Sequence, residues 1–408
     1  MISRLLGYIL LCGAVVLAAS VFYRNSDKSD VPLIFSPVQF LNATWLTYKQ
    51  AYVEQGSFRT IDTSRGGITT SEGQSYTMLR AVFMGDKTTF DGAWKWTQGN
   101  IFHTNDHLFA WLWGKKPNGT YGVLTAQNGE TSASDADTDI ALSLVFAYAR
   151  WQDPTYLASA RATIGDIWDK EVIQINGMPY LTADNIEKSS TNAYAAVNPS
   201  YLNPAAYRVF ALIDKSHPWG ALADSSYVLL QNSMRANLDK KQSAGLAPDW
   251  IDINKTTGAV QAIPGAINTT NFGFDAMRVP FRLALDWEWF KDSRDMATLK
   301  QLSFLGTAWD TNHALAATYS HDGAVLDAGE TPAMYGATLG YFMLEASSTA
   351  QVVYDQKLTF LYAPGANTWK EPLSYYDDNW AWFGIALYNH LLPNLAATIP
   401  PSALMSTS

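Results

Sequence analysis

Apolar residues recur at helical spacing along most of this chain, and no other feature constrains its fold as strongly. In nine segments they stand three and four residues apart, as on a helix with one buried face. These segments are Ser75 to Met84, Thr138 to Trp151, Tyr156 to Lys170, Asn203 to Asp214, Ser225 to Leu238, Asp275 to Trp289, Met296 to Leu305, Pro332 to Ser347 and Trp380 to Leu391. Strand patterns are short, as at Ala259 to Ile263. The chain is therefore predicted to be all-α, with long loops between its helices.

The domain organisation follows from the absence of a break in this pattern. Beyond Trp45 no stretch is rich enough in Pro, Gly or Ser to separate two domains. A chain of 408 residues with 48% hydrophobic content can also bury a core of that size. We predict a linker over residues 25–40, one helical domain over residues 41–395 and a C-terminal tail over residues 396–408.

The N-terminus carries a targeting pattern. Arg4 precedes an uncharged apolar run from Leu5 to Tyr23, and Arg24 and Lys28 follow it. We predict that residues 1–24 are a signal peptide, with an uncleaved membrane anchor as the alternative because the run is long enough to span a bilayer. Either segment implies export. The single cysteine, Cys12, lies within this run, so the remaining chain has no thiol for a disulfide, a nucleophile or a metal site.

Charge and aromatic content narrow the class of partner. A net charge of −9 argues against nucleic acid or an anionic membrane surface. The chain has 15 Trp and 21 Tyr although only 16% of its residues are charged. Such rings suit a cleft in which they stack on the apolar faces of sugars, and they equally suit an aromatic helical core.

The first candidate for chemistry is Glu72, in the motif SEGQSY. Ser71 is a good helix N-cap and the apolar periodicity begins directly afterwards, which places Glu72 in the first turn of a helix. An acidic residue there commonly stabilises the helix dipole and has no other role. A proton donor at this position would need burial against apolar neighbours, since the helix N-terminus alone favours the anion.

The second candidate lies in ASDADTDIALSLVFAYARW. Asp135 and Asp139 are four residues apart and share one helical face, whereas Asp137 points elsewhere, and Ser134 is the predicted cap. Three acids in five residues repel one another unless a cation or a donor-rich ligand lies among them. Capping with a solvated first turn is the plain alternative, and a calcium loop is disfavoured because no loop glycine or bidentate Glu follows.

The third candidate is FGFDAMRVPFR. Asp275 and Arg278 are three residues apart near the start of a predicted helix, and Arg282 follows one turn later. An arginine at that spacing would keep the carboxylate ionised, as a base or a sugar-binding group requires. The plain alternative is a helix-face ion pair. A metal at His103 and His107 is disfavoured, because their HTNDH motif lacks the Glu of a metalloprotease helix.

Taken together, these motifs resemble those of glycoside hydrolase family 8, the family of bacterial endoglucanases and of the cellulase of cellulose-synthesis operons. The resemblance also rests on LFAWLWGKK, NPSYLNPAAYRVF and YYDDNWAWFGIAL, which follow in the family's order, and it covers residues 45–391. It implies an (α/α)6 barrel with a long substrate cleft at one end. It also implies hydrolysis with inversion, without a metal or an organic cofactor.

The resemblance further assigns roles to individual residues. Glu72 would be the general acid and Asp275 the general base, with Asp135 and Arg278 holding the sugar. Stacking positions would be Trp113, Tyr201, Tyr375 and Tyr376, with Trp111 or Trp380 as alternatives. One departure is Asp139, where members associated with cellulose synthesis often carry a bulky residue.

The resulting hypothesis is an exported, monomeric endo-β-1,4-glucanase of the periplasm or the medium, with xylan, chitosan or mixed-linkage glucan as alternative substrates. Its partner would be a polysaccharide, and an exopolysaccharide synthesis complex is a further candidate. A non-catalytic polysaccharide-binding subunit of a secretion system is the rival from another class, and retention of both Glu72 and Asp275 argues against it. A polysaccharide lyase is disfavoured because no basic cluster marks an anionic sugar.

Overall fold

The structure is a computed structural model that describes residues 36–266 and 268–405. From Pro37 onward these residues form one compact unit. The predicted signal peptide or anchor over residues 1–24, and the first part of the predicted linker, lie outside the described residues. Within the described ranges, no helix is both long and apolar enough to cross a membrane.

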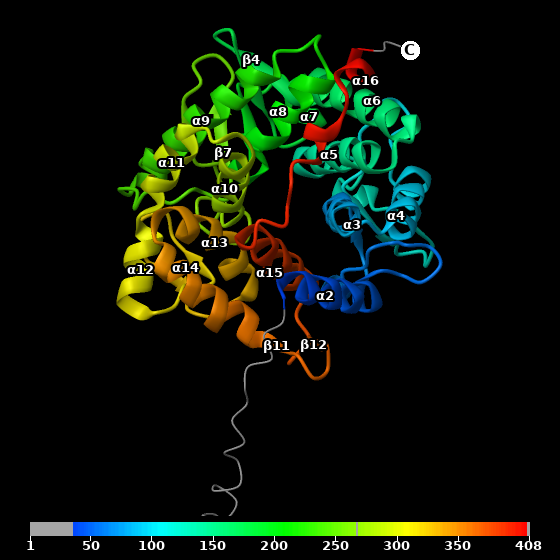
Figure 1. Ribbon diagram of the computed structural model, residues 1–408. Coiled ribbons are helices and arrows are strands. Elements are labelled where there is room, and N and C mark those ends of the chain that lie inside the picture. Colours follow the sequence, from blue (N-terminus) through cyan, green and yellow to red (C-terminus); the bar gives the residue numbers. More distant parts are fainter. Residues whose placement is uncertain (1–35, 267, 406–408) are drawn as a thin grey trace, which may run out of the picture. The chain divides into compact units, whose positions relative to one another are not determined.

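Six helices line the inside of a ring, and each packs against the next in chain order (Figure 1). They are α3 (Ser71–Met84), α5 (Ser134–Trp151), α8 (Pro204–Ile213), α10 (Arg278–Phe290), α13 (Pro332–Glu345) and α15 (Tyr375–Tyr388). The side chains of Tyr76 on α3 and Trp380 on α15 close the ring with an edge-to-face contact. Inner helices are buried almost all round; in α13, for example, every residue from Ala333 to Phe342 is buried. This is the expected composition of a helix surrounded by protein.

An outer helix packs against each inner helix. The outer layer comprises α2 (Pro37–Tyr52), α4 (Lys87–Asn100), α6 (Pro154–Glu171), α9 (Trp219–Arg235), α11 (Ser293–Leu299) with α12 (Phe304–Asn312), and α14 (Ser347–Val353). The outer helix of the last inner helix, α15, is α2, which comes from the start of the described chain (Figure 1). The arrangement confirms the predicted (α/α)6 barrel.

Glycine allows the closest helix approach in the barrel, between α13 and α15. A Cβ atom on Gly336 would lie 2.1 Å from the carbonyl oxygen of Trp380, and one on Gly384 would lie 2.2 Å from the carbonyl oxygen of Gly336. Both distances are far shorter than a van der Waals contact, so the two backbones touch only because neither position has a side chain.

The short strands occupy the connections that lead from an outer helix into the next inner helix. They are β1 (Thr69–Thr70), β2 (Leu112–Lys115), β3 (Tyr121–Val123), β4 (Val172–Ile175), β5 (Met178–Leu181), β6 (Tyr194–Val197), β7 (Ile251–Asn254), β8 (Val260–Gln261), β9 (Thr318–Tyr319), β10 (Val325–Asp327), β11 (Tyr362–Ala363) and β12 (Thr368–Trp369). All pairings between them are antiparallel, with sheet orders β1-β2-β3 and β6-β7-β8. The long loops therefore gather at the N-terminal ends of the inner helices, and this end can carry a site.

Several predicted boundaries need correction. The segment Met296 to Leu305 is not one helix, because a 3-10 turn at Lys300–Leu302 separates α11 from α12. The α2 helix begins at Pro37, inside the predicted linker, because Phe40 and Leu41 are buried on it. The predicted tail is also structured: Leu395–Thr398 and Pro401–Met405 (α16) are helical, and Ala396 and Ile399 are buried.

Candidate active site

The guanidinium group of Arg278 is the centre of the site. It lies at the first residue of α10 and is completely buried. Its Nη1 atom donates to Glu72 Oε2 at 2.9 Å and to Asp135 Oδ2 at 2.9 Å, and its Nη2 atom donates to Asp275 Oδ1 at 2.7 Å. The structure thus brings together four predicted site residues from three distant parts of the chain. They meet because α3, α5 and α10 all present their N-terminal ends on the same side of the barrel.

Glu72 occupies the first turn of α3, as predicted, but its cap is Thr70 and not Ser71. Thr70 ends β1 with extended backbone angles, and its hydroxyl accepts from the backbone N–H of Gly73 at 3.0 Å. Of the Glu72 side chain, 22% remains exposed. Its pKa is raised to about 7: burial is the largest cause, the charge of Arg278 opposes it, and the charges of Asp135 and Asp275 add to it. Burial therefore outweighs both the arginine and the helix dipole.

Asp135 lies in the first turn of α5 and is buried. Burial raises its pKa, Arg278 opposes that effect, and Asp139 adds to it. The predicted cap Ser134 is instead the first residue of α5, and its hydroxyl donates to the carbonyl of Thr182 at 2.6 Å. Asp137 points away, as predicted, and accepts from the backbone N–H of Phe109 at 3.1 Å. The alternative of a solvated first turn is wrong, because all three aspartates are buried.

Asp275 projects from the turn that precedes α10, and 32% of its side chain is exposed. Its second oxygen, Oδ2, accepts from the indole N–H of Trp250 at 2.9 Å. Beside it lies a depression of about 510 Å³, whose polar lining includes Asn271 and Asp327 and whose apolar lining includes Phe274. The carboxylate is therefore fixed at both oxygens and still open to water or a ligand.

Two of the predicted aromatic residues lie at this centre. The ring of Tyr201 lies beneath the Arg278 guanidinium, 5.3 Å from ring centroid to Cζ. Tyr376 donates a hydrogen bond to the carbonyl of Phe274, next to Asp275. Both rings are partly exposed, so they remain candidates for sugar contacts.

The other aromatic candidates are placed differently. Tyr375 is 2% exposed and Trp380 is also buried, so neither ring offers an open face; the expectation of stacking at these two positions is corrected. They face the core because α15 is an inner helix. Trp113 stacks on Tyr121 at 5.4 Å between centroids and has Arg59 over its ring at 4.8 Å. Trp111 donates its indole N–H to the carbonyl of Asn128 at 2.9 Å.

Sequence reasoning missed three residues of the site. Tyr76 places its hydroxyl 3.3 Å from Arg278 Nη1, and its position one turn after Glu72 was the only available sign of this contact. Asp249 and Trp250 reach Asp275 from the loop before β7. No local pattern distinguishes these two residues from any other Asp-Trp pair.

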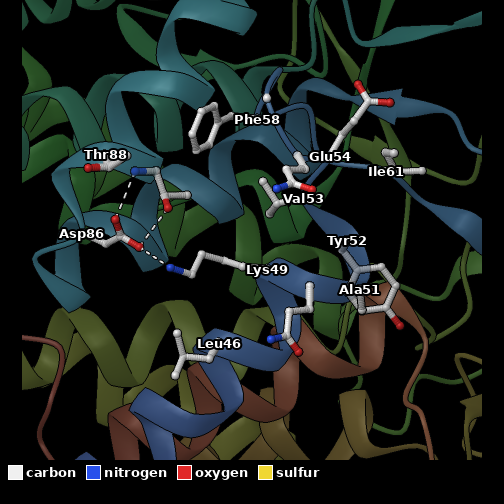
Figure 2. Close-up of a pocket in the computed structure, with 14 residues that line it drawn as sticks. Leu46, Lys49, Ala51, Tyr52, Val53, Glu54, Phe58, Ile61, Asp86 and Thr88 are labelled. Atoms are coloured by element: carbon white, nitrogen blue, oxygen red, sulfur yellow. Dashed lines mark hydrogen bonds and ion pairs between the residues drawn. The ribbon is translucent and has the colours of Figure 1, made fainter.

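A larger hollow lies elsewhere, between α2, the following loop and the start of α4 (Figure 2). Its volume is about 780 Å³, and its wall includes Leu46, Phe58 and the ion pair of Lys49 with Asp86 at 2.6 Å. None of the residues predicted for the site contributes to this wall. Its size alone assigns it no role.

Comparisons with known proteins agree with this geometry. The family model described as "Glycosyl hydrolases family 8" matches residues 33–358. "Endoglucanase" of Escherichia coli (strain K12) is 33% identical over 58% of this chain and 60% of that protein. "Endoglucanase 2" of Ruminiclostridium josui is 30% identical over 61% of this chain and 50% of its own length. This chain thus spans 50–60% of the length of these two relatives.

A solved structure supports the fold. The endo-1,4-D-glucanase of Vibrio fischeri ES114 superposes with a TM-score of 0.68 at 25% sequence identity, covering 85% of this chain and 94% of that one. At this coverage the likeness extends over most of the chain and not over a local motif only.

Proposed function

This chain belongs to glycosyl hydrolases family 8, and on that premise we propose that it is an inverting, endo-acting hydrolase of a β-1,4-linked glucan. The observation that carries the proposal is the cluster of three carboxylates on the single guanidinium of Arg278. Hydrolysis of a glycosidic bond needs one protonated and one ionised carboxyl group on opposite sides of the bond. Glu72 and Asp275 supply such a pair, and the names of the relatives favour a glucan.

Glu72 acts as the general acid. Its pKa of about 7 keeps it protonated at mildly acidic pH, where an ordinary glutamic acid would be ionised. The proton passes to the oxygen of the leaving sugar as the bond to the anomeric carbon breaks. The anionic product form of Glu72 is then stabilised by Arg278 at 2.9 Å.

Asp275 acts as the general base. Arg278 and Trp250 hold its two oxygens in place, and the adjacent depression gives it access to water. It takes one proton from the attacking water, and the remaining hydroxyl forms the new bond to the anomeric carbon. The leaving sugar takes the proton of Glu72, so the two products together gain the atoms of one water molecule once the proton on Asp275 has returned to Glu72 through solvent. Because both carboxylates bind neighbouring nitrogens of one planar group, their bound oxygens lie no more than about 8 Å apart. This limit is compatible with the roughly 6.5–9.5 Å of inverting enzymes.

Asp135 and Arg278 complete the site by holding the sugar and the two catalytic carboxylates. Asp135 keeps one oxygen on Arg278 and its other on the backbone N–H of Ala136 at 2.8 Å. Tyr201 and Tyr376 border the same centre and are our candidates for sugar contacts, with Trp113 as a further position along the β2–β3 sheet.

The test is hydrolysis of soluble carboxymethyl-cellulose by Glu72→Gln, with a panel of glucan, xylan, chitosan and mixed-linkage glucan for the wild type. We expect the variant to lose about 10²–10⁴-fold in kcat, which is the usual contribution of a general acid. Glu288→Gln, at the other end of α10, is the matched control and should retain activity. Undiminished hydrolysis by Glu72→Gln would end the assignment.

The chain's location is part of the proposal. We propose that residues 1–24 direct export to the periplasm or the medium, with inner-membrane anchoring if they are not cleaved, and that residues 41–395 act as a monomeric catalytic domain. The pattern of Arg4, the apolar run and Arg24 supports this. An exopolysaccharide synthesis complex remains a candidate partner. N-terminal sequencing of the protein recovered from cell fractions tests the cleavage and the location together.

A further inference from the structure

The carboxylate of Asp275 is held by two donors that come from different elements. Arg278, on α10, binds Oδ1 at 2.7 Å, and Trp250, directly before β7, binds Oδ2 through its indole N–H at 2.9 Å. One donor on each oxygen fixes both the position of the carboxylate and the rotation of its plane. The indole itself is held by an edge-to-face contact with Tyr201 at 5.6 Å and by the backbone bond from Trp250 N–H to the carbonyl of Thr269.

The residue before Trp250 holds the backbone from which Asp275 projects. Asp249 Oδ1 accepts three backbone N–H groups, from Gly273 at 3.2 Å, Asp275 at 3.1 Å and Ala276 at 2.7 Å. The approach is close: a Cβ atom on Gly273 would lie 2.7 Å from Asp249 Oδ2. One carboxylate oxygen thus organises the whole turn that leads into α10.

We infer that Asp249 and Trp250 are a positioning unit for Asp275, in which Asp249 fixes the backbone of the 273–276 turn and Trp250 fixes the side-chain oxygen. This inference rests on the proposed role of Asp275 as general base. A base must lie within hydrogen-bond reach of the attacking water, and a displacement of about 1 Å can reduce the rate by about 100-fold. The exposed carboxylate would otherwise be free to rotate into the neighbouring depression.

Other charged and titratable groups also face Asp275, and the experiment must separate Trp250 from them. They are Glu72 on α3, Asp135 on α5, Tyr201 before α8, Asp249 before β7, Arg278 on α10, Asp327 on β10 and Tyr376 on α15. Replacement of Trp250 by phenylalanine leaves all of them in place and removes only the N–H donor and part of the ring.

The first experiment compares kcat and KM of the wild type and Trp250→Phe on soluble substrate. Loss of the indole donor to Asp275 Oδ2 should lower kcat by about tenfold, because a hydrogen bond to a charged group is stronger than one between neutral groups, with KM changed by no more than about threefold. The control is Trp289→Phe, which removes an indole N–H bound to the carbonyl of Leu392 at 2.7 Å, away from the site. A kcat in Trp250→Phe equal to that of the control, or a loss confined to KM, overturns the role of Trp250.

The second experiment compares Asp249→Ala with Asp249→Asn. The asparagine keeps an Oδ1 acceptor for the three N–H groups and should retain most of kcat, whereas the alanine should lose about 100-fold in kcat with KM changed by no more than about threefold. Equal losses in the two variants, or a loss confined to KM, overturn the role of Asp249.

Hydrogen exchange gives a readout that needs no activity. The amides of Gly273, Asp275 and Ala276 should lose protection in Asp249→Ala and keep it in Asp249→Asn. If the wild type hydrolyses no polysaccharide, the proposed function fails even when this protection pattern is found. If the wild type is active and Glu72→Gln is not, unchanged protection in Asp249→Ala overturns the positioning unit alone.

Discussion

Two layers of charge lie one helical turn apart between α5 and α10, and they differ in a way that explains the site. In the upper layer Asp135 meets Arg278, and four residues further along each helix Asp139 meets Arg282. Arg282 binds Asp139 with two parallel bonds, at 2.8 and 2.7 Å, and both side chains are buried. Arg278 instead divides its donors among Glu72, Asp135 and Asp275.

The difference lies in charge balance and access, since the residue types are the same. The lower layer has one cation for one anion and no opening to solvent, as expected of an ion pair that only stabilises the barrel. The upper layer has three carboxyl groups for one arginine, and Glu72 and Asp275 are partly exposed. The excess of negative charge adds to burial in raising the pKa of Glu72 to about 7, and thus one carboxyl group retains its proton. Under the proposed function, a repeated structural pair acquires a catalytic role when two further carboxyl groups join it.

The largest effect should follow from removal of the base in the upper layer. Asp275→Asn keeps the shape of the side chain and removes its ability to accept a proton from water. We expect kcat on soluble β-1,4-glucan to fall by about 10³–10⁴-fold, with the thermal unfolding midpoint within a few degrees of the wild type. Activity within tenfold of the wild type would show that the base is another group.

Breaking the lower layer should affect stability and leave the chemistry intact. Asp139→Asn leaves Arg282 without a counter-charge in a buried position, which should lower the free energy of unfolding by about 3–5 kcal/mol. In the folded fraction kcat should change by less than about threefold. Denaturant unfolding monitored by tryptophan fluorescence measures the first quantity, and an assay corrected for the folded fraction measures the second.

The matched variant in the upper layer is Asp135→Asn. It removes one of three carboxyl groups from Arg278 but leaves the arginine two others as partners, so we expect a smaller loss of stability but about a 100-fold loss in kcat/KM. If the two variants had the same profile of stability and activity, the distinction between the layers would be wrong.

The pH dependence of activity sharpens the comparison at Glu72. The acid must be protonated to act, and its pKa is raised to about 7, so kcat/KM should fall as pH rises through about 7, by up to tenfold per pH unit above it. An ordinary glutamic acid would lose its proton near pH 4.5. An alkaline limb close to pH 5 would therefore contradict the effect of burial. Stopped assays from pH 4 to pH 9 on soluble substrate provide the profile.

A second buried carboxyl pair, Asp137 on α5 and Glu171 at the end of α6, tests whether a raised pKa alone makes a catalyst. Glu171 is completely buried next to Asp137, and its pKa is raised to about 8. Burial is the largest cause, and it outweighs the hydrogen bond from the Ser132 hydroxyl, which lowers the pKa. Between pH 4.5 and 8 the folded state thus binds a proton that the unfolded state has lost, and stability should fall as pH rises through that range. We expect Glu171→Gln to reduce this slope by about 1 kcal/mol per pH unit while kcat stays unchanged. Unfolding curves at four pH values measure the slope, and an unaltered slope would contradict the account.

Helical periodicity was sufficient to predict the all-α class, because inner helices such as α5 and α13 carry continuous apolar faces. It did not identify α2 and α4. In α4 the sequence KTTFDGAWKWTQGN contains three threonines and two glycines, so tertiary packing of Phe90 and Trp94 overrides a poor helix propensity. The 3-10 turn Leu395–Thr398 likewise depends on the burial of Ala396, which no local pattern reveals.

The residues of the site likewise fall into those that the sequence could predict and those that depend on tertiary packing. Glu72, Asp135, Asp275 and Arg278 could be predicted because each stands in a motif whose order along the chain resembles a known family. Burial of Tyr375 could not, since it depends on which side of α15 faces the core. Trp250 contacts Asp275 from a loop 25 residues away, a proximity set by how the 269–276 segment pairs with that loop.

The anomeric configuration of the first product tests the central claim most directly. If water enters between Asp275 and the sugar while Glu72 protonates the opposite side, cleavage of a β-linked glucan must release the α-anomer first. Proton NMR of a soluble cello-oligosaccharide digest, recorded in the first minutes before mutarotation, resolves the two anomeric signals. We expect the α signal to appear first and the β signal to grow only later. Initial release of the β-anomer would contradict the account. Retention of configuration requires a covalent glycosyl-enzyme intermediate, whereas in the proposed mechanism Asp275 activates water and forms no bond to the sugar.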